Sequence, residues 1–498
     1  SSVYSPYCLT GLLNLVDFAQ DAEIKNLATI AAQRLLKDLL KLTTDQGVFF
    51  PTAGRNYYGK YQSAWGQNHS NLIYLLTGLG QAPTNASHAG GFLASSTLEI
   101  DSVADSWAPV IDTSYYNGMP LDTLLTIDTV LRPIDKVILQ WSAGAYFHPE
   151  VAYETDLLLT DSSLWNHTDF APFRSLQSVP ASGAVDLANQ LSALSKSSVI
   201  SGDTIVIFKH NSVSLSSVRD FWKGKVGYQE FPCAATVGST AVLTASGPID
   251  STWNHRSAEN ANEDLPYVGQ HKNVALLMYR PETVPAFLGY NHKEVALYWN
   301  QPDFDEQTTD SNWIIGRQGG NYVAVRRSCT DSISHIIACD IMPGQSWVIV
   351  VGDSGMYGNF SNFQSLVHQS QFTENWYLDS VNQQYVYYAK IVFDTTTIDY
   401  AWGVDSSTTT AIKQIVANPE LSVYPNPANN TINIQMPELA GQHVNIAIAN
   451  LLGQQLYNTN KTVVGTETID VSTLPEGAYV ITVRNGQSLY TAKLIKRE

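Results

Sequence analysis

A stripe of apolar residues with helical spacing stands out near the start of the chain. Its members recur every three or four positions: Ile24, Leu27, Ala31, Leu35 and Leu39. That period is typical of one face of an α-helix. Asp21 precedes the stripe, and aspartate is among the residues favoured at the N-cap of a helix. We therefore predict a helix that is capped by Asp21 and runs to about Leu42.

Further helices are predicted in the same N-terminal region, at residues 61–78, 121–146 and 185–194. Gly78 and Gly80 end the first of them, because glycine is common just past a helix C-terminus. Pro133 marks a break in the second. Long loops rich in glycine, serine, asparagine and aromatic residues, such as 54–59 and 81–96, separate the helices. Helical hairpins joined by such loops predict that residues 1–198 form a partial α/α toroid, with further helices expected before this chain.

From about Ser201 the period of the apolar pattern changes to two residues. Seven segments have the composition of β-strands, at residues 204–208, 241–244, 274–279, 295–299, 322–325, 347–351 and 385–393. No helical pattern between them could form the crossovers of a parallel sheet. Residues 199–404 are therefore predicted to be a large antiparallel β-sandwich.

The C-terminal part of the chain shows a third pattern. A run rich in serine and threonine begins a predicted linker at residues 405–419. Residues 420–498 contain short alternating strands separated by asparagine, proline and glycine turns, which predicts a small Ig-like β-sandwich. The predicted fold class is thus a multidomain α + β protein with three domains, as expected for a chain of 498 residues.

Composition excludes some classes of partner. The net charge of −17 argues against nucleic acid, because nucleic-acid-binding proteins are usually basic. No apolar run approaches the roughly 20 residues needed to span a bilayer, so no membrane-spanning segment is predicted.

Four motifs of the C-terminal region carry a resemblance to a known family. They are Tyr424-Pro-Asn-Pro427, Leu451-Leu-Gly-Gln454, Leu474-Pro-Glu-Gly-Ala-Tyr479 and Lys493-Leu-Ile-Lys496. In this order they closely resemble the C-terminal sorting domain of the type IX secretion system of Bacteroidetes. The resemblance implies export across the outer membrane, display on or release from the cell surface, and recognition of residues 420–498 by the type IX machinery. Export also requires a signal peptide, and none begins at Ser1, so we expect a processed or truncated form.

A second resemblance covers most of residues 1–400. It is carried by residues 217–231, 265–275 and 313–325, and in the helical region by Gly54-Arg-Asn-Tyr57 and residues 141–150. These stretches look like a family of lyase-like proteins that are grouped by fold with heparinase II/III-type polysaccharide lyases. The resemblance implies a helical toroid followed by a β-sandwich, and uronic-acid-containing glycans as the substrate class.

Lyases of this architecture cleave uronic-acid glycosides by β-elimination, which needs a group to neutralise the carboxylate, a base and an acid. The candidate residues are Arg55, Tyr57, Tyr58, Asn68, His69 and His148. A tyrosine of the pair 57–58 would transfer the proton, while Arg55, Asn68 or His69 would neutralise the carboxylate. Each also has a structural interpretation: carbonyl binding for Arg55, packing for the tyrosines, capping or packing for Asn68 and His69, and a helix junction for His148. No complete catalytic tetrad can be mapped, so the residues leave enzymatic activity open.

Two further features concern metal binding and disulfides. Asp303, Asp305 and Glu306 could bind calcium, but a solvated turn is the better interpretation, and no metal or cofactor is predicted. Cys329 and Cys339 flank a predicted hairpin and could form a disulfide in an oxidising compartment. Whether Cys8 and Cys233 pair is left open by the sequence.

Two functions therefore compete. The first is a secreted or cell-surface polysaccharide lyase-like protein that acts on or binds uronic-acid-containing glycans, with its cleft between the helices and the sandwich. The alternative is a non-enzymatic surface adhesin or a subunit of an extracellular assembly.

Overall fold

The protein is described here by a computed structural model. It describes residues 5–50, 52, 63–82, 88–117, 132–142, 148–168, 177, 183, 204–219, 221–224, 231–246, 265–280, 294–310, 312–327, 336–340, 344–379, 384–402, 422–436, 439–450, 455–485 and 488–497. The chain divides into two compact units, residues 1–395 with 399–404, and residues 396–398 with 405–498. The predicted linker, 405–419, lies outside the described residues.

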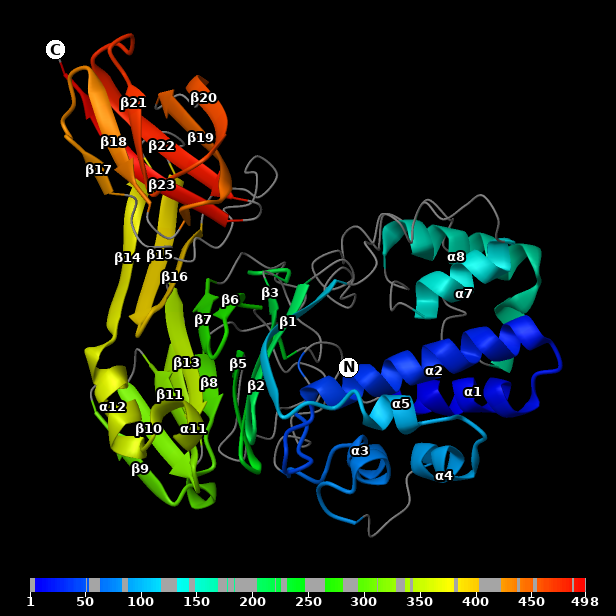
Figure 1. Ribbon diagram of the computed structural model, residues 1–498. Coiled ribbons are helices and arrows are strands. Elements are labelled where there is room, and N and C mark those ends of the chain that lie inside the picture. Colours follow the sequence, from blue (N-terminus) through cyan, green and yellow to red (C-terminus); the bar gives the residue numbers. More distant parts are fainter. Residues whose placement is uncertain are drawn as a thin grey trace. The chain divides into compact units, whose positions relative to one another are not determined.

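The N-terminal region is mainly helical, as predicted. Its elements are α1 (Ser5–Phe18), α2 (Ala22–Leu42), α3 (Ser70–Thr77), α4 (His88–Ser95), α5 (Asp101–Ala104), α7 (Pro133–Ser142), α8 (Pro149–Asp161) and the 3₁₀ helix η3 (Leu164–Asn166). Helices α1 and α2 lie side by side (Figure 1). The predicted cap is confirmed, because the Asp21 carboxylate accepts hydrogen bonds from the backbone N–H groups of Glu23 and Ile24.

The buried face of α2 differs from the predicted stripe. Ala28, Ala32 and Leu36 pack into one hydrophobic core with α1, whereas Ile24 and Leu27 are exposed. Small alanine side chains allow the two helices to approach closely, and this contact sets which face turns inward. Only the C-terminal half of the predicted stripe is covered.

Several predicted boundaries change in the helical region. Helix α3 begins at Ser70, because residues 63–69 form turns, and α4 lies inside the predicted loop 81–96. Pro133 occupies the first position of α7, where its missing N–H is not needed by the helix. Residues 118–131 and the predicted helix 185–194 lie outside the described residues.

Two antiparallel sheets form the sandwich, and they pack face to face (Figure 1). The first has the order β1-β2-β3-β4-β5-β8-β12. Its strands are β1 (Val110–Asn117), β2 (Thr204–His210), β3 (Val213–Arg219), β4 (Cys233–Val237), β5 (Thr240–Ser246), β8 (Glu294–Tyr298) and β12 (Ile336–Asp340). Strand β1 comes from the helical region of the sequence and pairs with β2.

The second sheet has the order β6-β7-β13-β11-β10-β9. Its strands are β6 (Tyr267–His271), β7 (Val274–Tyr279), β13 (Gln345–Asp353), β11 (Asn321–Arg326), β10 (Trp313–Gln318) and β9 (Glu306–Thr309), and the 3₁₀ helix η6 (Gln301–Asp303) precedes β9. Alternate side chains of both sheets meet in one core that includes Tyr279, Trp299 and Trp347. The predicted antiparallel architecture is confirmed.

The predicted hairpin that ends in Cys329 and Cys339 is wrong. Strand β11 lies between β13 and β10, whereas β12 pairs with β8 in the other sheet. The chain changes sheets between these neighbouring strands. Cys329 lies outside the described residues, so the Cys329–Cys339 disulfide stays a prediction. The hairpin that first suggested this disulfide is not formed. Cys8 is an exposed free thiol, and Cys233 is a buried one whose pKa is raised to about 12 by burial.

A third sheet follows β13 and two short helices, α11 (Ser354–Tyr357) and α12 (Phe360–Gln369). It contains β14 (Gln371–Asp379), β15 (Gln384–Phe393) and β16 (Thr396–Trp402). The buried hydroxyl of Tyr387 on β15 lies 2.7 Å from the Ser346 hydroxyl on β13 and donates to the Glu374 carboxylate on β14. These bonds tie the third sheet to the sandwich.

The C-terminal unit is a small antiparallel β-protein with its own core. Its strands are β17 (Ser422–Tyr424), β18 (Thr431–Gln435), β19 (His443–Asn450), β20 (Gln455–Thr462), β21 (Thr466–Asp470), β22 (Gly477–Asn485) and β23 (Ser488–Lys496). They form sheets of order β17-β18-β21 and β20-β19-β22-β23 around a core that includes Ile434, Ile446 and Ile481. No helix in the described part of the chain is long and apolar enough to cross a membrane.

Candidate functional site: a pocket between helix α2 and strand β2

The predicted catalytic residues divide into two groups. Arg55, Tyr57 and Tyr58 lie outside the described residues. Asn68 and His69 form the turn that leads into α3, where Asn68 is half-buried and His69 is 1% exposed. The His69 ring packs edge-on against Phe49, with 4.9 Å between the ring centroids. Packing against an aromatic ring is therefore part of the role of His69.

His148 has the structural role that its position before Pro149 suggested. It is the N-cap of α8, and its Nδ1 accepts a hydrogen bond of 3.3 Å from the backbone N–H of Glu150. Pro149 follows in the first turn, where proline is favoured. This imidazole nitrogen is used to begin a helix.

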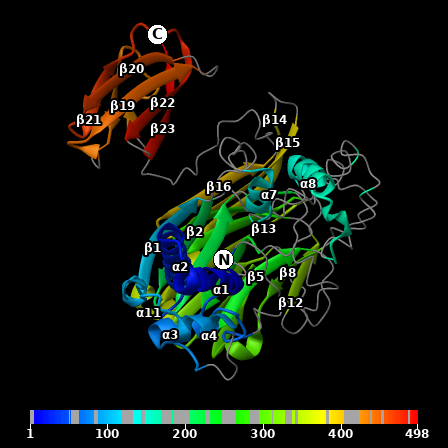
Figure 2. The same cartoon turned by 90° about the vertical axis from the view of Figure 1, so that its right-hand side faces the viewer.

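A pocket of about 440 Å³ lies where the helices meet the sandwich. Figures 1 and 2 show α2 beside β2, and the pocket is lined mainly by these two elements. Its lining residues are Ser5, Ala31, Arg34, Leu35, Asp38, Leu39, Leu42, Thr52, His69, Ile205 and Ile207. Among the predicted site residues that the structure describes, His69 contributes to its wall and Asn68 and His148 do not. The pocket lies between the helices and the sandwich, where a cleft was predicted.

The alternation of β2 explains the strand side of the pocket. Side chains of a strand point to opposite faces in turn. Ile205 and Ile207 therefore face the helices and pack with their core, while Phe208 joins the core between the two sheets. The sequence Thr204-Ile-Val-Ile-Phe208 is apolar on both faces because β2 is covered on both.

The residues that line the pocket differ in exposure. Leu39, Leu42, Thr52, His69 and Ile207 are buried, whereas Ala31 and Arg34 are exposed and form its mouth. The Thr52 hydroxyl donates a 3.0 Å hydrogen bond to the Ser216 carbonyl of β3. The buried part of the lining therefore combines aliphatic side chains with a hydroxyl and an imidazole.

An ion pair on α2 forms the polar part of the mouth. The Arg34 Nε donates to Asp38 Oδ2 over 3.0 Å, with the Arg34 side chain 64% exposed. The other carboxylate oxygen, Asp38 Oδ1, is buried and has no hydrogen-bond partner in the described part of the chain.

Lys209 continues the row of Ile205 and Ile207 toward the end of α2. Its Nζ donates to the carbonyl oxygens of Thr43 and Leu40, at 2.8 and 3.3 Å. Burial lowers the pKa of Lys209 to about 7, and the nearby Asp45 carboxylate opposes this change. The lysine satisfies carbonyls that the helix end would leave unpaired, so it joins the helical part to the sheet.

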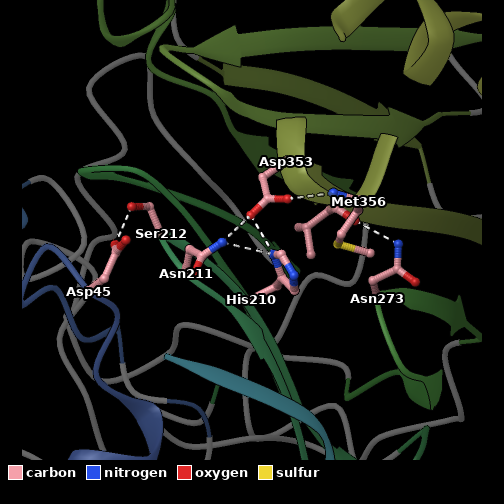
Figure 3. Close-up of polar contacts among 8 residues, drawn as sticks. Asp45, His210, Asn211, Ser212, Asn273, Asp353 and Met356 are labelled. Atoms are coloured by element: carbon pink, nitrogen blue, oxygen red, sulfur yellow. Dashed lines mark hydrogen bonds and ion pairs between the residues drawn. The ribbon is translucent and has the colours of Figure 1, made fainter. Parts of the chain in front are cut away.

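His210, the next residue of β2, points toward Asp353 of the second sheet (Figure 3). Its Nδ1 lies 2.5 Å from Asp353 Oδ2 at the end of β13, and Asn211 donates to the same oxygen over 3.1 Å. Asp353 Oδ1 accepts from the backbone N–H of Met356 and caps α11. The cluster connects the two sheets and was not predicted from the sequence. The polar turn His210-Asn-Ser212 at the end of an apolar strand is the sequence feature that could have indicated it.

The calcium alternative is not supported by the geometry of its three carboxylates. Asp303 accepts from the Thr240 hydroxyl, Asp305 from the backbone N–H of Gly319, and Glu306 pairs with Arg317. Each carboxylate thus has a different protein partner. Within the described part of the chain, no group of three histidine, cysteine or acidic residues is placed to hold a metal ion.

Comparison with known families identifies the C-terminal unit. Residues 422–497 match the model of the secretion system C-terminal sorting domain. This region is a type IX sorting domain. The protein is therefore exported and is extracellular or on the cell surface, as the four motifs predicted.

Comparison with solved structures gives distant likenesses for the chain, two of which are described here. One is a polysaccharide lyase, with 9% identity, 48% of this chain and 37% of that chain covered, and a TM-score of 0.12. Another is the BSP domain of a biofilm-associated protein, with 10% identity, 57% and 60% covered, and a TM-score of 0.14. The chain thus spans less than two thirds of either structure. No curated protein matches the sequence. Neither structure establishes a fold or an activity for the N-terminal unit.

Proposed function

We propose that this exported protein binds uronic-acid-containing glycans outside the cell through the pocket between α2 and β2. The observation that carries the proposal is the Arg34–Asp38 pair at the mouth of the pocket. A guanidinium group recognises a carboxylate with paired hydrogen bonds, and a carboxylate accepts bonds from sugar hydroxyls. The apolar wall then packs against the C–H face of the ring.

The overall negative charge of the chain makes binding of an acidic glycan depend on a local cation such as Arg34. A net charge of −17 repels a polyanionic glycan at long range. Binding then depends on a local cation that contacts the carboxylate directly. Such a contact should give acidic glycans a much higher affinity than neutral glycans.

The test is calorimetric titration of the purified full chain with uronic-acid oligosaccharides and with neutral oligosaccharides. Arg34→Ala should weaken binding of the acidic set at least about tenfold, the scale of a lost charged hydrogen bond, and leave the neutral set unchanged. Lys37→Ala is the matched control, because Lys37 lies on the same helix, carries the same charge and does not line the pocket. Equal losses in both variants would assign the effect to net charge and remove the pocket from the proposal.

Cleavage is tested in the same mixtures by absorbance of the unsaturated uronide that β-elimination produces. If product forms, Arg55, Tyr57 and Tyr58 remain the proposed catalytic residues, with Asn68, His69 and His148 as the other candidates. Tyr57→Phe or Tyr58→Phe should then slow the reaction at least about a hundredfold. Product formation that neither substitution changes would discard these tyrosines. Binding without product would leave the protein as a glycan-binding relative of the lyases.

A second function, that of a surface adhesin or assembly subunit, is favoured by a different observation. Large apolar side chains are exposed near the junction of α1 and α2, at Leu15, Phe18, Ile24, Leu27 and Ile30. Exposed apolar groups of this kind are common at protein–protein contacts. Sedimentation of the full chain and of Leu27→Asp would test this function. Self-association that the substitution abolishes would support this function. A wild-type chain that stays monomeric at all concentrations would rule out self-assembly.

A further inference from the structure

Strand β14 forms one edge of the third sheet (Figure 1). Its nine residues, Gln371–Asp379, pair with β15 in one continuous register. Among the residues that the structure describes, no strand pairs with β14 on the side away from β15. Every second residue of an edge strand directs its backbone N–H and C=O groups away from the sheet. Strand β14 therefore presents a row of backbone groups to which a further strand can bond.

Other edge strands of the sandwich have features that prevent such pairing. Strand β9 has four residues, and the register of β1 shifts between Ile111 and Ser114. Strand β6 lies beside β3, where the Gln270 amide donates a 2.8 Å hydrogen bond to the Leu215 carbonyl. Short length, bulges and covering segments are common ways of protecting a sheet edge, as are lysine and proline. Strand β14 is long and unshifted, and its sequence contains neither lysine nor proline.

The inner face of β14 is fixed to neighbouring strands. The Arg326 guanidinium carbon lies 3.6 Å from the centre of the Phe372 ring, and the Trp376 ring stacks on Tyr387 with 4.9 Å between the centroids. Glu374 lies between Phe372 and Trp376 on this face and accepts a hydrogen bond from the Tyr387 hydroxyl. Its charge is therefore met within its own chain. A strand held in this way loses little conformational freedom when another strand pairs with it.

We infer that two copies of the chain associate by antiparallel pairing of their β14 strands, with a twofold axis at Asn375. This register uses all nine residues of the strand. It places Phe372 opposite Leu378 of the second copy, and Glu374 opposite Trp376 of the second copy. No two like charges are then opposite each other, whereas an axis at Glu374 would place two carboxylates opposite each other at a cost in stability. This association is independent of the glycan pocket and of the exposed apolar residues on α1 and α2.

The outer face of β14 adds side-chain contacts to this pairing. Its exposed residues are Gln371, Thr373, Asn375 and Tyr377. Tyr377, which is 44% exposed, lies opposite Thr373 of the second copy in this register. An aromatic ring beside a β-branched residue is a favourable cross-strand pair. The backbone hydrogen bonds of the added strand supply the affinity, and the side-chain pairs select the register.

The test is sedimentation of the full chain at about 0.15 M salt, which screens the repulsion between two negatively charged copies. The wild type should form a dimer. Asn375→Lys places two ammonium groups opposite each other and should raise the dissociation constant of the dimer at least about tenfold. Thr309→Lys is the matched control, because Thr309 is exposed on β9 and the substitution changes the net charge equally. A monomeric wild type, which would leave the edge to a strand of another protein, or equal effects of both substitutions would overturn the inference.

A mixing experiment tests the register. Asn375→Asp alone should also weaken the dimer, because two carboxylates then lie opposite each other. An equimolar mixture of Asn375→Lys and Asn375→Asp should restore the dissociation constant to within about threefold of wild type, because an ammonium group then faces a carboxylate. Tryptophan fluorescence checks that each variant is folded. Folded variants that do not recover association on mixing would overturn the axis at Asn375. A dimer that Leu27→Asp disrupts and Asn375→Lys leaves intact would overturn pairing through β14 and assign self-association to α1 and α2.

Discussion

The side-chain nitrogen of Lys209 lies 2.8 Å from the carbonyl oxygen of Thr43, at the C-terminal end of α2. The lysine belongs to the sheet and the carbonyl to the residue that ends the helix. Because both are buried, the bond forms only when the helix is docked on β2. It couples the helical part to the sandwich beside the candidate pocket.

This contact predicts a stability that rises with pH. Burial lowers the pKa of Lys209 from 10.5 to about 7. Between these values the unfolded chain binds a proton that the folded chain lacks, so the free energy of unfolding increases as pH rises from about 7 to about 10.5. In Lys209→Met this contribution is absent. Between pH 7 and pH 9 the free energy of unfolding of the wild type should therefore rise relative to that of the variant. A difference between the two proteins that does not change with pH would contradict the assignment. Tryptophan fluorescence suits the measurement, since all 11 tryptophans precede residue 403.

Tyr387→Phe should destabilise the N-terminal unit. The buried phenol hydroxyl bridges Ser346 and Glu374, and its pKa is raised by burial and by the Glu374 carboxylate. Loss of this group leaves buried acceptors without their donor, at a cost of about 1–3 kcal/mol. Tyr377→Phe is the control, because Tyr377 on the neighbouring strand is exposed and its loss should change stability by less than about 0.5 kcal/mol. Urea unfolding followed by fluorescence measures both, and equal effects would refute the bridging role.

Gly47→Ala should be costly, and Gly91→Ala should not. Gly47 has a φ of +73°, and a methyl group there would lie 2.5 Å from the backbone nitrogen of Gly80. Neither backbone can move easily, so we expect a loss of more than about 1 kcal/mol. Gly91 lies in α4 with open space around its Cα, and alanine there should stabilise the helix by up to about 1 kcal/mol. A Gly47→Ala variant with wild-type thermal stability would show that the loops around Gly47 and Gly80 do not pack as closely as the structure has them.

Removal of residues 420–498 should block export and leave the N-terminal unit folded. The sorting domain has its own hydrophobic core and strand pairing, and the two units are separately compact. Cell fractionation should find the truncated protein inside the outer membrane, with the tryptophan fluorescence of the folded form. Ile446→Asn, which places an amide in the core of the sorting domain, should reproduce the defect in the full-length chain. Normal secretion of either variant would refute the assignment.

The sandwich was largely predictable because its inner strands are apolar on one or both faces. Each of the seven predicted strand segments overlaps a strand of the structure. The missed strands have polar sequences, such as β3, where buried serines alternate with Val213 and Leu215, and β9, which is exposed. Their conformation depends on pairing with neighbouring strands, and local composition does not record it.

The helices and the pocket show the limits of local patterns more sharply. Helix α4 contains Gly90 and Gly91, which disfavour a helix, yet the buried Ala89 and Leu93 hold it in the core. The pocket combines Ser5, residues of α2, Thr52, His69 and two residues of β2. These residues lie up to about 200 positions apart in the sequence, so only the tertiary fold brings them together. The sorting domain was the opposite case, because its motifs are contiguous.

Strand β1 has an evolutionary consequence. Val110–Asn117 lies among the helices in the sequence but completes the edge of the first sheet by pairing with β2. A recombination event near residue 198 would part a strand from its neighbour, so the helices and the sandwich cannot be inherited as separate exchangeable modules. The sorting domain has no strand in those sheets. Genetic exchange can therefore attach the same export signal to unrelated cargo, whereas the cargo itself has to diversify as one indivisible piece.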